Sequence, residues 1–206
     1  NTAETLAEQY SISRQEQDEF AIASHNKAVK AQNEGLFDEE IVPIEIKSRK
    51  GSQWVSKDEG PRPDISLEKL SLLRPAFKKD GFVTAGNASS MNDGAACLIL
   101  VSERKMKELG LKPMAEIVCI ESYGVAPEVM GIGPAKVVPK VLAKMELQIE
   151  DIDTWEINEA FASQCIAVNK ELNIPLEKLN PLGSGISLGH PVGCTGIRIV
   201  VTLLHH

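Results

Sequence analysis

The sequence has few cysteines and no long apolar run, and each absence excludes a class of protein. The four cysteines lie far apart and form no Cys-x-x-Cys pair, which indicates reduced thiols rather than a disulfide framework. No apolar run approaches the ~20 residues that a membrane-spanning helix needs. The first residues, Asn1 to Glu4, are typical of neither a signal peptide nor a transit peptide. We therefore expect a cytoplasmic protein without a membrane partner.

The chain also lacks an excess of basic residues. It contains 22 lysines and arginines against 29 aspartates and glutamates, which gives a net charge of −7. This balance gives no indication of nucleic-acid binding, although a local basic patch could still hold the phosphates of a small ligand. The length of 206 residues is enough for one or two domains with a sizeable core.

Apolar residues in the chain alternate between the spacing of strands and the spacing of helices. Strands are predicted at residues 41–46, 82–84, 97–101, 115–120, 155–157 and 186–188. Helices are predicted at residues 1–35, 67–73, 102–109, 137–145, 161–172 and 197–204. The alternation of the two kinds of element predicts a layered α/β fold.

Cap residues and prolines indicate where some of these elements begin. Ser13, with Glu16 three residues later, is typical of a capping box at a helix start. Pro43 restricts its strand to the edge of a sheet, because proline has no N–H group to donate. Pro139 requires its helix to begin within the preceding turn.

Two stretches about thirty residues apart carry the polar groups of a candidate site. They are NEAFA at residues 158–162 and GHPVGCTG at residues 189–196. Each follows an apolar or glycine-rich run and precedes a helical pattern, as a turn at the carboxyl end of a strand does. The first offers an amide and a carboxylate, and the second offers an imidazole on a loop whose N–H groups favour an oxygen anion. These are parts of an acyl-transfer site.

Each polar residue of the two stretches also has a structural alternative. His190 could accept a proton from a thiol, or be a histidine held by turn hydrogen bonds. Asn158 could donate to an oxyanion or a water, or be the N-cap of a helix that begins at Glu159. Glu159 could be a general base, or a carboxylate placed in the first helical turn, and we favour a structural and orienting role.

The cysteines are expected to be structural. Cys194 follows His190 by four residues, which suggests a nucleophile pair, but we favour a small packed residue because a shared turn guarantees no contact. Cys97, Cys119 and Cys165 lie in apolar patterns and are predicted to be core residues.

Together with TAGNAS at residues 84–89, these stretches resemble the thiolase family of acetyl-CoA acyltransferases over essentially all 206 residues. The resemblance implies a five-layer αβαβα fold of two similar halves, with a loop domain inserted in the first. It also implies that this chain holds an incomplete form. Residues 1–89 would be the remainder of the loop domain, 90–112 the last strand and helix of the first half, and 113–206 a truncated second half. The nucleophilic cysteine and a final Cys-x-Gly loop are expected outside the chain.

The resemblance also implies roles for site residues. His190 would activate the nucleophilic cysteine and, with a water positioned by Asn158, form an oxyanion hole. The residues expected to bind the pantetheine, the acyl group or the adenine of coenzyme A are Ser89, Ala160, Phe161, Met130, Phe77 and Arg62. For these the alternatives are ordinary core packing and a solvated arginine. Lys69 departs from the family pattern near the adenine.

By this resemblance the whole protein is an acetyl-CoA C-acetyltransferase. It would condense two acetyl-CoA to acetoacetyl-CoA and CoA, or run the reverse thiolysis, through an acylated cysteine. No metal or redox cofactor is expected, the coenzyme A thioester is the substrate, and a homo-oligomer, either dimer or tetramer, is implied. The alternatives are a 3-ketoacyl-CoA thiolase of fatty-acid β-oxidation, a non-catalytic thiolase-like scaffold or lipid-binding protein, and an α/β domain without acyl-CoA function.

The 206-residue chain by itself is expected to be inactive and to fold poorly. The apolar stripes of the helices predicted at 161–172 and 197–204 would face elements that the chain does not contain. Exposed apolar surface of that extent is rare on monomers.

Overall fold

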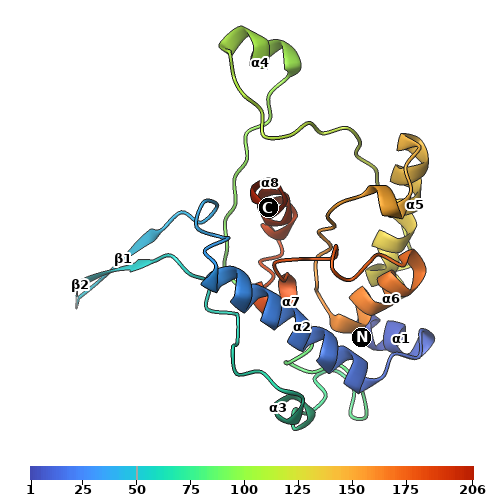
Figure 1. Cartoon of the computed structure of the whole chain (residues 1–206). Coiled ribbons are helices and arrows are strands. Elements are labelled where there is room, and N and C mark those ends of the chain that lie inside the picture. The colour runs from blue at the N-terminus through green and yellow to red at the C-terminus, as the bar shows by residue number, and fades with distance from the viewer. Residues whose placement is uncertain (50) are drawn as a thin grey trace.

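A computed structural model shows the arrangement of the chain, and it describes residues 1–49 and 51–206 (Figure 1). The helices are α1 (Thr2–Gln9), α2 (Arg14–Asn33), α3 (Leu67–Ser71), α4 (Glu103–Leu109), α5 (Gly133–Met145), α6 (Ala162–Leu172), α7 (Gly185–Leu188) and α8 (Thr195–His205). Two 3-10 helices, η1 (Pro127–Ile132) and η2 (Ile149–Asp151), flank α5. The expected single helical region at residues 1–35 is thus two helices, separated by Ser11 with a φ of 50°.

Local sequence explains several element ends. The predicted capping box at the start of α2 is confirmed, because Ser13 and Glu16 exchange hydrogen bonds between side chain and backbone. The expectation for Pro139 is wrong, because α5 begins six residues earlier, at Gly133, and contains the proline. A proline there leaves one helical carbonyl without its N–H donor.

The regular sheet in the described part of the chain is a hairpin of β1 (Ile44–Ser48) and β2 (Gly51–Val55). The strands pair antiparallel, with Ile44 opposite Val55, and the hairpin projects from the body (Figure 1). The strand predicted at residues 41–46 therefore starts three residues later, directly after Pro43. The strand begins after Pro43 because proline has no N–H group to donate to the hydrogen bonds between strands.

The strands predicted between residues 82 and 120 are wrong. Residues 97–101 and 115–120 have no regular secondary structure, and Ile99 and Ile120 are 89% and 76% exposed. A strand forms only where a neighbour completes its ladder of hydrogen bonds, and these segments have none among the described residues. For the same reason Cys97 is exposed and Cys119 is partly exposed, and the prediction that they are core residues is wrong.

Two further strand predictions fail in different ways. Residues 155–157 make one isolated parallel bridge, between Trp155 and Leu179, and residues 186–188 lie in the short helix α7. Thr84 likewise makes one isolated bridge, with Pro75.

The largest core lies where α1, α6 and η1 meet. Leu6 of α1 and Val168 of α6 are each 1% exposed within it. Cys165 and Leu172 of α6 are also buried, so the prediction that the apolar stripe of α6 would stay uncovered is wrong. In the stripe predicted for helix α8, Ile197 and Val200 are exposed as expected, whereas Val201 and Leu204 are partly buried.

None of the helices that the structure describes has both the length and the apolar character that crossing a bilayer requires. Residues 1–49 and 51–206 also contain no group of three or more His, Cys, Asp or Glu side chains arranged to hold a metal ion.

Candidate active site

The side chains of Asn158 and His190 lie in contact, which confirms the prediction that they come close in space. The amide Nδ2 of Asn158 is 3.3 Å from Nε2 and 3.4 Å from Nδ1 of His190. The expected reason, that both follow strands of one sheet, is wrong, because His190 follows helix α7 and Asn158 follows a segment with a single isolated bridge at Trp155. An amide and an imidazole that lie 32 residues apart in the chain thus meet side chain to side chain.

Asn158 is held in place by the segment before it. Trp155 donates from its N–H group to the carbonyl of Lys178 at 2.8 Å, and Asn180 donates from its N–H group to the carbonyl of Trp155 at 2.8 Å. The side chain of Asn180 then accepts from the N–H of Ile157 and donates to its carbonyl, both at 2.8 Å. These bonds fix the backbone as far as the residue before Asn158.

The alternative role of Asn158 as a helix cap is wrong. Helix α6 begins at Ala162, and its N-cap residue is Phe161. Oδ1 of Asn158 is buried without a hydrogen-bond partner in the described part of the chain. It faces Gly185, where an added Cβ would come within 2.6 Å of it. A glycine is therefore needed beside the Asn158 amide.

The contacts of Glu159 favour a structural and orienting role over that of a general base. Its side chain is buried, and the hydroxyl of Ser24 donates to Oε2 at 2.5 Å. The amide of Asn180 donates to Oε1 at 2.9 Å. Both carboxylate oxygens are thus engaged, and Glu159 connects α2 to the segment that carries Asn158.

Short contacts around its loop orient the ring of His190. The Thr195 hydroxyl lies 2.7 Å from Nδ1 and donates its own hydrogen to the carbonyl of Pro191 at 3.0 Å. Because that hydroxyl has one hydrogen, it must accept from Nδ1, so Nδ1 carries the proton and Nε2 offers a lone pair. The backbone N–H of His190 donates to the carbonyl of Ser90 at 3.2 Å.

The electrostatic surroundings of His190 favour its neutral form, which can accept a proton. Burial lowers the pKa of this imidazole, and the positive charge of Arg198 lowers that pKa further. The ring is therefore neutral at neutral pH, which is the form that can take a proton from a thiol.

Four of the residues predicted to bind coenzyme A lie together. The N–H of Ser89 donates to the carbonyl of Ala160 at 2.9 Å. The rings of Phe77 and Phe161 meet edge to face, with centroids 6.1 Å apart, and Phe77 is 53% exposed. These four residues form a partly aromatic group, in which Ala160 and Phe161 continue from Asn158 along the chain, and their binding role stays a prediction.

Met130 and Arg62 are not part of this group. Met130 is 66% exposed on η1, and Arg62 lies exposed in the loop after β2, where its N–H donates to Nδ1 of His25 at 3.2 Å. Lys69 pairs with Asp64 at 2.5 Å. In the described part of the chain, no hydrogen bond or ring contact joins Met130 or Arg62 to the other predicted residues.

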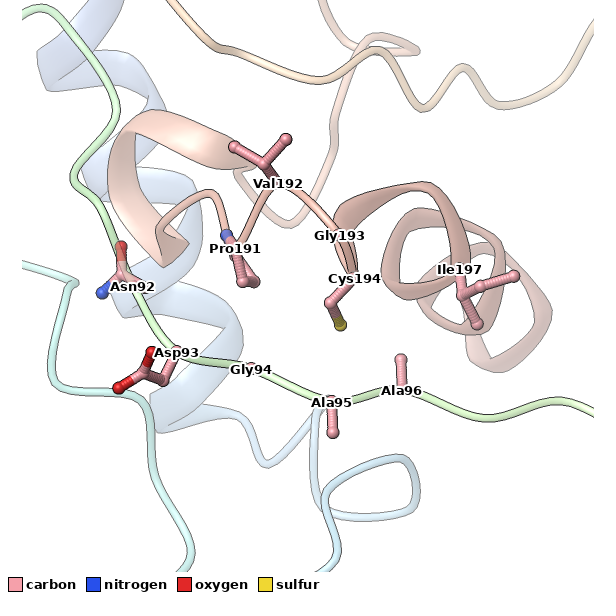
Figure 2. A pocket seen from close by; sticks show the side chains of 10 residues that line it. All are labelled: Asn92, Asp93, Gly94, Ala95, Ala96, Pro191, Val192, Gly193, Cys194 and Ile197. Carbon is pink, nitrogen blue, oxygen red and sulfur yellow. The ribbon is translucent and has the colours of Figure 1, made fainter.

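A pocket of about 320 Å³ lies beside the glycine-rich loop (Figure 2). The residues that line it are Asn92, Asp93, Gly94, Ala95, Ala96, Pro191, Val192, Gly193, Cys194 and Ile197. Cys194 is buried in its wall and makes no hydrogen bond to His190 among the described residues, in agreement with a packed residue. Cys165 is also buried, and burial raises its pKa well above the ordinary value.

Sequence reasoning missed Thr195, Gly185 and Arg198. Thr195 could have been suspected from its place five residues after His190 in the same loop. Arg198 is the one charged residue in the apolar stretch 195–204, a signal that was available. Gly185 had no signal, because its role depends on the approach of Asn158.

The chain matches two family models over almost its whole length. The model "Thiolase, N-terminal domain" matches residues 1–104, and "Thiolase, C-terminal domain" matches residues 111–206. A probable acetyl-CoA acyltransferase of Staphylococcus aureus strain COL is 57% identical over 205 residues, which are 99% of this chain and 52% of that protein.

Solved structures give the same result. The chain is similar to the acetyl-CoA acetyltransferase of Bacillus anthracis with a TM-score of 0.96 and 58% identity, over 99% of this chain and 52% of that one. It is similar to human mitochondrial 3-ketoacyl-CoA thiolase with a TM-score of 0.92 and 42% identity, over 99% and 52%. The chain spans about half the length of these proteins, and the predicted incomplete α/β thiolase fold is confirmed. The chain belongs to the thiolase family.

Proposed function

We propose that the protein in its full length is a thiolase, an acetyl-CoA C-acetyltransferase that acts on coenzyme A thioesters. The observation that carries the proposal is a contact between two side chains. A neutral His190, on the glycine-rich loop 189–196, touches the amide of Asn158. This pair offers a base and a hydrogen-bond donor side by side, as acyl transfer from a thioester requires.

In the first half-reaction, Nε2 of His190 takes the proton of a cysteine thiol supplied from outside residues 1–206. The thiolate attacks the thioester carbon, and the C–S bond to coenzyme A breaks. The departing thiolate takes the proton from the imidazolium, which leaves an acylated cysteine. A water positioned by Asn158 would hold the thioester oxygen together with His190.

In the second half-reaction, a base from the Cys-x-Gly loop expected in the family removes a proton from the methyl group of a second acetyl-CoA. The carbanion attacks the acyl carbon, the C–S bond to the cysteine breaks, and acetoacetyl-CoA is released. The cysteine thiolate then regains a proton, which the base took from the second acetyl-CoA. The chemistry uses coenzyme A as a substrate and needs no metal or redox cofactor. We further propose a cytoplasmic homo-oligomer, a dimer or tetramer.

A degradative 3-ketoacyl-CoA thiolase is the second candidate. The similarity to the human mitochondrial 3-ketoacyl-CoA thiolase supports it, and the same two side chains would serve it. The two candidates differ in the length of the acyl chain that the Phe77–Phe161 surface has to accommodate.

Steady-state thiolysis by the purified full-length protein tests the proposal. A higher kcat/KM for acetoacetyl-CoA than for long 3-ketoacyl-CoA would support the acetyltransferase. A higher kcat/KM for the long substrates would support the degradative enzyme. Absence of thiolysis and of condensation with every chain length, despite measurable coenzyme A binding, would identify a non-catalytic thiolase-like protein.

A further inference from the structure

The guanidinium of Arg198 is largely buried between two segments of the site, and the proposed reaction does not use it. The side chain of Arg198 is 19% exposed, and that of Glu156, whose Oε2 lies 4.0 Å from Nη1, is 4% exposed. Nη2 donates to the hydroxyl of Ser184 at 3.2 Å. Arg198 thus joins α8 to two other parts of the chain.

Each of these contacts leads to a residue of the site. Glu156 precedes Asn158 by two residues, and Ser184 is the N-cap residue of α7, which leads into His190. Arg198 itself lies one helical turn after Thr195, whose hydroxyl accepts from the ring of His190. One side chain therefore connects the segments that hold the amide and the imidazole.

The pairing of Arg198 and Glu156 is incomplete. Nη1 of Arg198 and Oε2 of Glu156 are both buried and have no hydrogen-bond partner among the described residues. Their 4.0 Å separation allows an ion pair but exceeds a hydrogen bond. Replacing such a pair by apolar side chains is often neutral or stabilising, so stability alone is a poor reason for its presence.

We propose that Arg198 is a positioning residue of the site, which keeps Asn158 and His190 in contact through Ser184 and Glu156. The proposal rests on the thiolase function proposed above, because it assigns Arg198 a part in that reaction. Misplacement of reacting groups by about 1 Å can lower a rate by about 10²-fold, so a residue without substrate contact can matter to turnover.

The charge of Arg198 adds a second effect that a purely mechanical support would not have. It lowers the pKa of His190 in addition to burial, and so favours the neutral imidazole. The carboxylates that face Arg198 are Glu156 before Asn158, Glu40 after α2, and Asp58 after β2. Burial raises the pKa of Glu156 to about 8, so this partner is mostly protonated at neutral pH and balances little of the positive charge.

Two substitutions in the full-length protein separate position from charge. Arg198→Lys keeps the charge but loses the planar guanidinium, whose Nη2 donates to Ser184 while its Nη1 lies 4.0 Å from Glu156. Arg198→Gln keeps a donor but loses the charge. Arg104→Gln in α4 is the matched control, because the Arg104 side chain is 84% exposed and far from the site in Figure 1.

Two readouts are measured for each variant. The first is kcat and KM for thiolysis of acetoacetyl-CoA. The second is the pKa of His190 from the pH dependence of hydrogen exchange at its ring carbon Cε1, followed by mass spectrometry, which needs no activity. We expect both Arg198 variants to lose roughly 10- to 100-fold in kcat with little change in KM. We expect the pKa of His190 to rise in Arg198→Gln and to change little in Arg198→Lys.

The outcomes distinguish this proposal from the one on which it rests. If the wild-type protein shows no thiolysis, the proposed function fails, whereas the pKa of His190 in Arg198→Gln still reports whether Arg198 acts on the ring. A lower melting temperature with unchanged kcat and unchanged pKa would mean a structural role only and would overturn the proposal. If Arg198→Gln does not fold, Arg198→Lys decides: a reduced kcat supports the positioning role, and a wild-type kcat refutes it.

Discussion

The hydroxyl of Ser24 in α2 donates a 2.5 Å hydrogen bond to the carboxylate of Glu159, the residue that follows Asn158. Both side chains are buried, and 135 positions separate them in the sequence. Through this bond the long helix α2 fixes the backbone that presents the Asn158 amide. The geometry of the site therefore depends on a helix that contributes none of its proposed catalytic groups.

Removing this bond should destabilise the protein. Ser24→Ala leaves a buried carboxylate oxygen short of a donor, so we expect the free energy of unfolding to fall by about 1–3 kcal/mol. Urea denaturation of the full-length protein measures it. Ser71→Ala is the control, because the exposed Ser71 hydroxyl bonds a carbonyl at the surface of α3. Equal midpoints for the two variants would contradict the assigned role of Ser24.

Glu156 should make stability depend on pH. Burial raises its pKa from 4.5 to about 8, so between these values the folded protein binds a proton that the unfolded chain releases. The unfolding free energy contributed by this group is thus present below pH 4.5 and is lost as pH rises towards 8. Glu156→Gln should remove that decline, which denaturation at several pH values detects. If the unfolding free energies of wild type and variant change in parallel with pH across this range, Glu156 does not make this contribution.

Replacing His190 should abolish turnover while leaving ligand binding largely intact. Loss of general-base assistance typically costs ~10²–10⁴ in rate, so His190→Ala should lower kcat by that factor with little change in coenzyme A affinity. In the wild-type protein, kcat/KM should fall only below pH 6.5, because the pKa of this ring is lowered. His205→Ala, at the end of α8, is the control. A wild-type kcat in His190→Ala would remove His190 from the mechanism.

Two glycines of the same loop should respond differently to alanine. Gly189 has a φ of +94°, and an added Cβ would lie 2.4 Å from Oδ1 of Asn92, whereas nothing lies within 4 Å of a Cβ at Gly193. We expect Gly189→Ala to reduce thermal stability by about 1–3 kcal/mol and to impair thiolysis. Gly193→Ala should be close to wild type in both. Similar losses in the two variants would show that the positive φ and the close contact at Gly189 do not require glycine.

The 206-residue chain expressed by itself should be inactive and prone to association. None of its cysteines has a hydrogen bond to His190 in the described part, and Ile99, Val118 and Ile120 are each at least 66% exposed. At ~25 cal/mol per Å² of apolar surface, even a few hundred Å² left in water rivals the net stability of a domain. Light scattering and a thiolysis assay test both parts. A monomer with a sharp cooperative melt, or measurable acetoacetyl-CoA cleavage, would contradict them.

Sequence patterns predicted the family, the capping box of Ser13 and the meeting of Asn158 with His190. These three predictions depend on local chemistry or on long motifs, which lie within the chain although it spans only about half the length of its relatives. The patterns failed for residues 97–101 and 115–120, because an apolar run becomes a strand only beside another strand. They also failed for residues 186–188, where four residues after a glycine-rich turn form a helix instead.

The Asn180 side chain takes the place of a neighbouring peptide group. Its amide meets both the N–H and the carbonyl of Ile157, as one residue of an adjacent strand would, and its second hydrogen goes to Glu159. Aspartate could not imitate a peptide, since it lacks the donors and would bring a second negative charge beside Glu159. One side chain thus supplies Ile157 with the pair of hydrogen bonds that a neighbouring strand would give, so this position requires an amide that can both donate and accept.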